Sequence, residues 1–192
     1  MDNVIHRKAK AEDLDEVADV LAVGFGQLFH QLTRKEDEIR ALLRSLILLE
    51  NFYVVEVDGR IAGCLALSAE GSRSSQVDSS EFRRIVGLVK GTIGAWVVRR
   101  LLTVPYELPE DTAYFEYVTI LPEFRRRGLS SSLIMDTVER TEFRRYMLDV
   151  TSDNMEAYQL YEKLGFREVK REKERFAKQA GFEYRIYMAL ET

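Results

Sequence analysis

A strand, a turn and a helix that opens with glycine follow one another between Ala113 and Leu133. The segment AYFEYVTI at its start is rich in aromatic and β-branched residues, which suit a half-buried strand. Pro122 cannot continue that strand, and after Gly128 apolar residues recur at helical spacing. The rest of the chain is expected to be organised around this strand–turn–helix unit.

Three consecutive arginines, residues 125–127, stand directly before the predicted helix. A helix N-terminus carries a partial positive charge and unpaired N–H groups, so these arginines oppose the helix dipole. A bound anion would remove that conflict, and Gly128 would let its oxygens approach the backbone closely. The serines at 130–132 are small and add hydroxyl donors. A solvated basic turn on an ordinary crossover is the alternative that these residues leave open.

Two motifs connect this turn with a known family. The spacing Arg125-x-x-Gly128-x-Ser130 resembles the Q/R-x-x-G-x-G/A phosphate loop of the GNAT superfamily of acetyl-CoA-dependent N-acetyltransferases. The segment that begins at Asn154 is similar to the second signature of that family, N-x-x-A-x-x-L-Y-x-K-x-G-F. The resemblance covers about residues 3–169. Ser130 departs from the usual Gly or Ala but is small enough to fit, so the departure bears on affinity rather than on function.

The resemblance implies an α/β (α+β) fold with a mixed, mostly antiparallel central sheet flanked by helices. A single N-acetyltransferase domain over residues 1–192 is expected. The local patterns agree with this, because residues 51–69 read as a hairpin around an Asp-Gly turn. Residues 70–80 have almost no apolar content and predict a mobile loop, and the charged run 167–178 predicts a solvated strand edge or hairpin.

The main departure from the family pattern is an insertion before the central strand, at about residues 79–105. A helix is predicted over 81–104, where Ile85, Val89, Ile93, Trp96 and Val97 share one face. Its three glycines weaken a helix but permit close approach by another backbone or a ligand. We expect this helix to pack against the rest of the domain, and we prefer this interpretation to a substrate lid. Attachment to a membrane surface, suggested by basic residues within the apolar run, ranks below both.

Composition excludes several classes of protein. A chain of 192 residues can form one domain with a full core, and a net charge of −4 argues against nucleic-acid binding. The single cysteine, Cys64, excludes an intramolecular disulfide and a CxxC site. With only two histidines, no metal site is expected. The N-terminus has no apolar segment of the signal-peptide type, so a cytoplasmic location is expected.

The chemistry that the resemblance implies is transfer of the acetyl group of acetyl-CoA, the expected co-substrate, to a primary amine of a small molecule or peptide in a ternary complex. The amine must lose a proton, and the leaving thiolate benefits from gaining one. Tyr161 matches the family position whose phenol protonates the CoA sulfur. Glu116 is the candidate base, because it is the one carboxylate of its strand and alternates in phase with Tyr114 and Val118. A salt-bridged structural carboxylate is the open alternative for Glu116.

The resemblance assigns the contacts with acetyl-CoA mostly to backbone. The end of the central strand would hydrogen-bond the pantetheine arm, the turn and helix start would hold the pyrophosphate, and an amide on the later helix would contact the same ligand. The predicted binding residues are Val118, Thr119, Ile120, Arg125, Arg126, Arg127, Gly128, Leu129, Ser130, Ser131 and Asn154.

The acceptor is not identified by these motifs. Loops at about 24–35 and 70–110 are expected to shape its site, with Phe25, Phe29 and His30 as candidates that core packing explains equally well. A non-catalytic acyl-CoA-binding module and an acyltransferase for longer acyl-CoA are the alternative functions. No nucleic-acid or membrane partner is expected, and both a monomer and a homodimer remain open.

Overall fold

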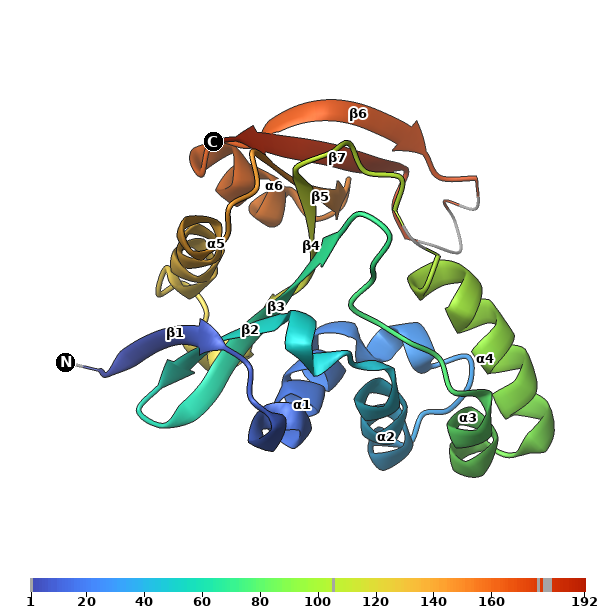
Figure 1. Ribbon diagram of the computed structural model, residues 1–192. Helices are drawn as coiled ribbons and strands as arrows, with labels where there is room; N and C mark the ends of the chain where they lie inside the picture. The colour runs from blue at the N-terminus through green and yellow to red at the C-terminus, as the bar shows by residue number, and fades with distance from the viewer. Residues whose placement is uncertain (1, 105, 176, 178–180) are drawn as a thin grey trace.

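The computed structural model describes residues 2–104, 106–175, 177 and 181–192. Residue 105 of the predicted insertion and residues 176 and 178 of the predicted charged run lie outside this described part. A seven-stranded sheet forms the centre, in the order β1-β2-β3-β4-β5-β7-β6 (Figure 1). Its strands are β1 (Val4–Lys8), β2 (Phe52–Val57), β3 (Arg60–Ala69), β4 (Thr112–Ile120), β5 (Arg145–Thr151), β6 (Arg167–Lys173) and β7 (Tyr184–Glu191).

All neighbouring strands are antiparallel except β4 and β5, which are parallel. The predicted mixed, mostly antiparallel sheet is therefore confirmed. The predicted hairpin is the β2–β3 pair, which turns at Asp58 and Gly59, both with positive φ. The charged strand β6 is exposed along its whole length at the edge of the sheet, as its composition predicts.

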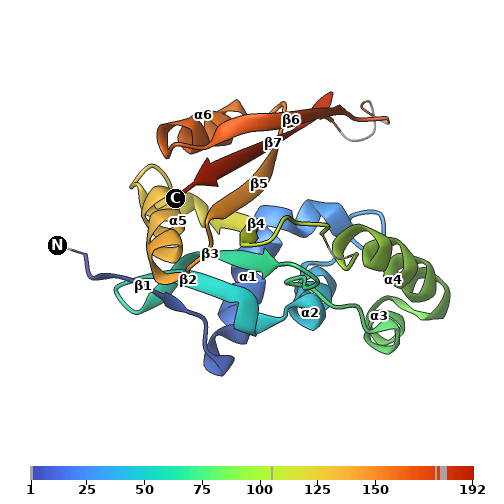
Figure 2. The same cartoon turned by 45° about the horizontal axis from the view of Figure 1, so that its top comes forward.

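Helices cover both faces of the sheet (Figures 1 and 2). One buried cluster joins β2 and β3 to two helices of the first face, and a second cluster joins the sheet to two helices of the other face. The first pair is α1 (Leu14–Phe25) and α2 (Glu36–Leu46), and the second is α5 (Leu129–Arg140) and α6 (Met155–Lys163). The cores are apolar because each of these helices presents its apolar residues to the sheet.

Strand β4 changes face at Tyr117, whose φ of 56° is unusual for a residue other than glycine. The register with β3 shifts between Cys64 and Ala66, which is where a β-bulge admits an extra residue. Tyr117 therefore packs in the α1–α2 cluster, and Val118 packs in the α5–α6 cluster. The prediction that Glu116 and Val118 share one face is wrong, because the bulge interrupts the alternation between them.

The parallel contact between β4 and β5 is short. Only three residue pairs join them, from Thr112↔Arg145 to Tyr114↔Met147. Beyond Tyr114 the two strands separate, so among the described residues the second half of β4 has β3 on one side and no strand on the other. Its backbone N–H and C=O groups on that open side are available to a ligand.

The insertion forms two helices rather than one. α3 (Ser79–Val86) and α4 (Leu88–Leu102) are separated by Gly87, whose φ is 87°. They lie beyond α2 at one end of the molecule (Figures 1 and 2). The predicted apolar face is not the packed one: Val89, Ile93 and Trp96 are exposed, whereas the small residues of α4 are buried. The small residues of α4 form the packed face because they allow α4 to approach α3 closely.

The predicted loop over 70–80 is a loop up to residue 78, where α3 begins at Ser79, and it is not uniformly solvated. Arg73, Ser74 and Ser75 are buried, and Ser75 forms an isolated bridge with Ile47. The prediction from composition fails here because buried polar side chains in this loop are paired with groups of the sheet.

Candidate acyl-CoA site

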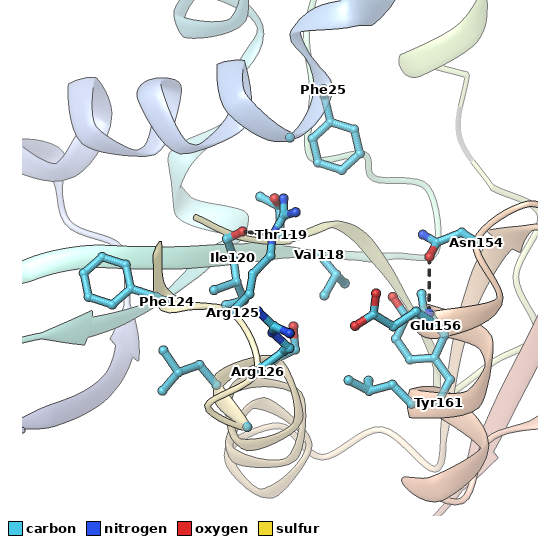
Figure 3. A pocket seen from close by; sticks show the side chains of 16 residues that line it. Phe25, Val118, Thr119, Ile120, Phe124, Arg125, Arg126, Asn154, Glu156 and Tyr161 are labelled. Atoms are coloured by element: carbon cyan, nitrogen blue, oxygen red, sulfur yellow. Dashed lines mark hydrogen bonds between the residues drawn. The ribbon is translucent and has the colours of Figure 1, made fainter. Parts of the chain in front are cut away.

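A cavity of about 390 Å³ opens where the strands β4 and β5 part (Figure 3). Four segments build it: the end of α1, the end of β4 with the turn that follows, the start of α5, and the first turns of α6. Its walls are formed by Gly24, Phe25, Val118, Thr119, Ile120, Phe124, Arg125, Arg126, Gly128, Leu129, Ser130, Asn154, Glu156, Ala157, Leu160 and Tyr161.

The turn between β4 and α5 has an unusual backbone. Arg126 and Gly128 both have positive φ, 59° and 76° respectively. Such a conformation costs about 1–3 kcal/mol for a residue other than glycine and tends to occur at functional sites. Left-handed residues of this kind occur in turns whose backbone N–H groups form concave anion sites. The backbone of this turn is therefore shaped for an anionic ligand.

The start of α5 continues this donor surface. In the part of the chain that the structure describes, no side chain caps the helix, and its first turn contains no acidic residue. The N–H groups of such a first turn have no partner inside the helix. Nothing lies within 4 Å of the position where Gly128 would carry a Cβ. Backbone donors, open space and the helix dipole thus favour a phosphate group at this point.

The three arginines have different environments. The Nε atom of Arg125 donates to the carbonyl oxygen of Ile120 at 3.1 Å, which holds this side chain along the wall of the cavity. Arg126 also lines the cavity. Arg127 does not: its guanidinium pairs with Asp2 and lies over the ring of Phe124. Two of the three cations are therefore positioned for an anion in the cavity.

Tyr161 lies on the wall opposite the arginines and is 8% exposed (Figure 3). Burial raises the pKa of its phenol above the ordinary value near 10, and the negative charge of Asp149 raises the pKa further. Among the described residues, none forms a hydrogen bond with its hydroxyl group. The group is therefore protonated at neutral pH and is available as a proton donor.

Asn154 and Glu156 face the cavity from the start of α6 (Figure 3). Asn154 is the N-cap of the helix, and its side-chain oxygen accepts from the backbone N–H of Ala157 at 3.2 Å. The sequence predicts Asn154 within the first turn instead, a shift of one position. Because the oxygen is used by the cap, the amide NH₂ is the part of Asn154 left to face a ligand.

Glu116 lies outside the cavity wall and is 8% exposed. Its Oε1 accepts from Arg73 Nη2 at 2.6 Å and from the hydroxyl of Tyr106 at 3.1 Å. Its Oε2 accepts from Ser68 and from the backbone N–H of Ser74, the latter at 3.2 Å. Both carboxylate oxygens are thus held by groups of the chain, as in the salt-bridged alternative that the sequence left open.

Asp149 of β5 is a second carboxylate near this centre, and the motifs do not point to it. One oxygen accepts from the hydroxyl of Tyr114 at 2.7 Å, and the other pairs with Arg185. Its side chain is 22% exposed, so water reaches it. Among the described residues, Asp149 is the one whose charge is felt by Tyr161. An acidic residue within the apolar strand RYMLDVT was the signal in the sequence.

The structure brings most of the predicted residues together at one cavity. The predicted residues on its wall are Val118, Thr119, Ile120, Arg125, Arg126, Gly128, Leu129, Ser130, Asn154 and Tyr161. Arg127, Ser131 and Glu116 are the predicted residues that do not line it. Phe25 lines it, Phe29 is in the core and His30 is exposed.

Some residues of the wall were not predicted for this site. Glu156, Ala157 and Leu160 belong to the same motif as Asn154, and their helical spacing could have placed them on one side of α6. Gly24 gave no local signal, since only the fold reveals its contact: a Cβ there would lie 2.5 Å from the Oγ1 of Thr119. Within the described residues, no group of three or more His, Cys, Asp or Glu side chains could hold a metal ion.

Solved structures share this architecture. An N-acetyltransferase from Staphylococcus aureus Mu50 superposes with a TM-score of 0.63 at 15% identity, over 97% of this chain and 100% of that one. A GNAT-family acetyltransferase from Bacillus cereus gives 0.60 at 15% identity, over 100% and 98%. The ribosomal-protein-S18-alanine N-acetyltransferase from Escherichia coli gives 0.55 at 19% identity, over 98% and 94%. These likenesses show the fold.

Among curated proteins, no relative matches this chain by sequence. The sequence model of the Acetyltransferase (GNAT) family, however, matches residues 27–166, which include β4, the turn at 125–128 and the whole of α6. This match spans well over half of the chain and includes both motifs. The chain therefore belongs to the GNAT acetyltransferase family, whose members are acyltransferases that use an acyl-CoA.

Proposed function

We propose that this protein is an N-acetyltransferase that moves the acetyl group of acetyl-CoA to a primary amine of a small molecule or peptide. The observation that carries the proposal is the position of Tyr161, a protonated phenol, across one cavity from the phosphate-type turn at 125–128. We further propose that residues 1–192 act as one N-acetyltransferase domain, since the insertion packs on the same cluster as α1 and α2.

The residues of the cavity fit the parts of acetyl-CoA. The turn and the first N–H groups of α5 suit the pyrophosphate, with Arg125 and Arg126 beside them. The open side of β4 at 118–120 suits the amide groups of a pantetheine arm, because its backbone is not paired with β5. Asn154 would contact the same arm through its amide. When bound, acetyl-CoA supplies the acetyl thioester.

Each protein group then has a defined task. Backbone N–H groups at the end of β4 would polarise the carbonyl of the thioester, and fixed donors of this kind stabilise developing negative charge without reorganisation. Tyr161 would hold a proton for the departing sulfur. A thiolate with an ordinary pKa near 8.5 is a better leaving group when it is protonated as it departs. The raised pKa of Tyr161 keeps that proton in place until it is needed.

The amine proton requires an acceptor, and two carboxylates are candidates. Glu116 was predicted for this role, but each of its oxygens already accepts two or more hydrogen bonds from buried groups. We assign the role to Asp149 acting through water, because its side chain is 22% exposed and its charge acts on Tyr161. Asp149 also lies outside the cavity wall and is engaged by Tyr114 and Arg185, but among the described residues each of its oxygens has one partner where those of Glu116 have two or more. Glu116 then has a structural role: it ties the 70–77 loop to β4.

The acceptor approaches from the side of α1 and its following loop in this proposal. Phe25 lines the cavity there, and its ring meets Tyr117 edge-on at 5.4 Å. Helices α3 and α4 contribute no residue to the cavity wall, so the apolar insertion does not favour a longer acyl chain. A primary amine attached to a small molecule or to a flexible peptide end is the class of acceptor we propose.

The experiment that tests the function is turnover of acetyl-CoA against a panel of small amines and peptides with free amino groups. Release of free thiol measures the transfer. We expect a rate that depends on the acceptor, while hydrolysis without an acceptor stays low. Ligand-induced stabilisation without thiol release for any acceptor would instead support the non-catalytic acyl-CoA-binding alternative. Absence of both would contradict the proposed function.

A further inference from the structure

Helix α4 packs on the molecule through its small residues. Gly91, Gly94, Ala95 and Val98 are buried. A Cβ on Gly91 would lie 2.5 Å from the carbonyl oxygen of Phe82, so α3 and α4 approach each other closely. This inner face is complete, and it leaves the larger apolar residues of α4 without a place in the core.

The opposite face of α4 is apolar as well. Val89, Ile93 and Trp96 lie at helical spacing and are 70%, 58% and 64% exposed. Leu101 lies eight residues after Ile93, two turns along the same i, i+4 ridge, and is 67% exposed. A contiguous exposed apolar stripe marks an interaction site. We call these four residues the outer stripe.

The charges on α4 have one sign. Lys90, Arg99 and Arg100 are exposed, and α4 contains no acidic residue. The Nη2 atom of Arg99 donates to the carbonyl oxygen of Val77 and to the hydroxyl of Ser79, both at 3.0 Å, which leaves Lys90 and Arg100 as the cations without such a bond to the described residues. The whole chain has a net charge of −4, so this helix is a local exception. Arg100 follows Trp96 by one helical turn, which places a cation beside the apolar side chains. The charge of α4 is therefore complementary to an anionic partner.

We propose that α4 docks this protein on the surface of an anionic lipid bilayer, with the outer stripe inserted among the lipid head groups. Tryptophan and branched aliphatic side chains partition into that interface, and flanking cations gain from the negative surface potential. The sequence alone ranked this function below packing. The structure reverses the order, because packing is achieved by the small residues and the large ones stay exposed.

A second copy of the chain is the competing occupant. A two-fold interface through α4 would bring the outer stripes together, but it would also bring each set of basic residues near the other set. Like charges across an interface are unfavourable. The bilayer avoids this conflict. In the part of the chain that the structure describes, no helix has the length and apolar character needed to cross a membrane.

Trp96 is the single tryptophan of the chain, so its fluorescence reports on α4 directly. Full-length protein is mixed with vesicles of phosphatidylcholine that contain phosphatidylglycerol, and with vesicles of phosphatidylcholine alone. We expect a blue shift of the emission, quenching by brominated lipid, and co-sedimentation with the anionic vesicles. The vesicles without anionic lipid should bind much less.

Two substitutions and a matched control separate the contributions. Ile93→Glu should abolish the blue shift, because it places a carboxylate in the centre of the outer stripe. Arg100→Gln should weaken the partition coefficient about fivefold, the effect of one cation near an anionic surface. Val169→Glu is the control, because it adds the same charge at another exposed apolar residue. Val169 lies on β6 and is 46% exposed, and this variant should bind vesicles like the unchanged protein.

The outcomes are decisive in both directions. A folded protein that shows no shift and no co-sedimentation with anionic vesicles overturns the proposal. Equal loss of binding in the Ile93 and Val169 variants overturns it too, because the effect would then be one of net charge. A vesicle-independent shift that rises with protein concentration, together with a doubled mass, would assign the outer stripe to a second copy instead.

Discussion

The middle and the end of strand β4 use polar groups in opposite ways. In the middle, Glu116 is buried with Arg73 and Tyr106, and its two oxygens accept hydrogen bonds from within the chain. At the end, the turn around Gly128 directs backbone donors toward a cavity. We name these the Glu116 cluster and the phosphate turn. Glu116 and Gly128 are twelve residues apart along the chain.

The Glu116 cluster and the phosphate turn differ in how much hydrogen-bonding capacity they leave for a ligand. A buried charge that is paired and hydrogen-bonded stabilises one conformation and has little capacity left for a ligand. A strained turn with unpaired donors is costly for the free protein and gains from an anion. Damage to the Glu116 cluster should therefore appear as lost stability, and damage to the phosphate turn as lost binding.

The largest effect is expected for Arg73→Met. It leaves the Glu116 carboxylate buried without its cation, and removal of one partner of a buried pair costs about 3–5 kcal/mol. Urea unfolding measures the loss. Arg60→Met is the matched control, since Arg60 pairs with Glu123 at the surface and such pairs contribute about 0–1 kcal/mol. Equal effects of the two substitutions would contradict the comparison.

Gly128→Glu should remove ligand binding at the phosphate turn. Acetyl-CoA at about 100 times its dissociation constant should stabilise the unchanged protein by about 2.7 kcal/mol, measured as a rise in melting temperature. The variant should show no such rise, because a carboxylate would take the place of the pyrophosphate. Gly59→Glu is the control: Gly59 also has a positive φ and open space, but it lies in the β2–β3 turn. It should lose similar intrinsic stability and keep the ligand response.

Tyr161→Phe should lower the rate by about 10²-fold, the typical contribution of a general acid, while the ligand-induced rise in melting temperature stays. Because burial raises the pKa of Tyr161, the phenol keeps its proton at alkaline pH, and the rate of the unchanged enzyme should not fall between about pH 7 and 9. Steady-state kinetics measure both. Tyr158→Phe, on the same helix, should retain its rate, and an unchanged rate in the Tyr161 variant would return that residue to the core.

Asp149→Asn and Glu116→Gln test which of the two carboxylates accepts the amine proton and which has a structural role. If Asp149 accepts the amine proton, Asp149→Asn should lower the rate about 10²-fold at neutral pH, with partial recovery at high pH where free amine is abundant. Glu116→Gln should lower stability and leave the shape of the pH–rate profile unchanged. Rate profiles and urea unfolding of both variants are the measurements. The opposite pattern would restore Glu116 as the base.

The smallest effect is expected for Arg127→Gln. Its side chain pairs with Asp2 at the surface, away from the cavity, so stability should change by about 0–1 kcal/mol. Arg126→Gln is the comparison on the wall of the cavity and should weaken acetyl-CoA binding more. Titration of the ligand with fluorescence or calorimetry ranks the two. Greater weakening by the Arg127 variant would mean that its ion pair opens when the ligand binds.

The phosphate turn could be predicted from sequence because all of its parts are local. Gly128, the arginines before it and the small residues after it lie in one segment, and chain continuity forces them together. The proximity of Tyr161 and Asn154 could be predicted for the same reason, since Asn154 is the N-cap of the helix that contains Tyr161. Local motifs of this kind predict which residues share a cavity wall, and their roles stay predictions.

The Glu116 cluster could not be predicted in this way. Arg73 lies in a segment whose composition is typical of a mobile loop, and its ion pair exists only because β3 and β4 are neighbours. The β-bulge at Tyr117 was also invisible, because nothing in YFEYVTI marks an extra residue. Likewise, the hydrophobic periodicity predicted the apolar residues of α4 but not which of its two apolar faces packs. Side-chain size determines that, because the face with small residues is the buried one.

The short contact between β4 and β5 also affects how the fold assembles. On one side of it, β1 to β4 are neighbours in both sequence and space, whereas β5 to β7 form the other half of the sheet. Three residue pairs form the β4–β5 ladder between the halves, and the cavity lies just beyond them. A ligand in that cavity would contact β4 on one side and α6 on the other. It would therefore link the two halves of the sheet. Amide hydrogen exchange in β4 and β5 should therefore slow on ligand binding, and the two halves of the sheet should unfold together rather than one after the other.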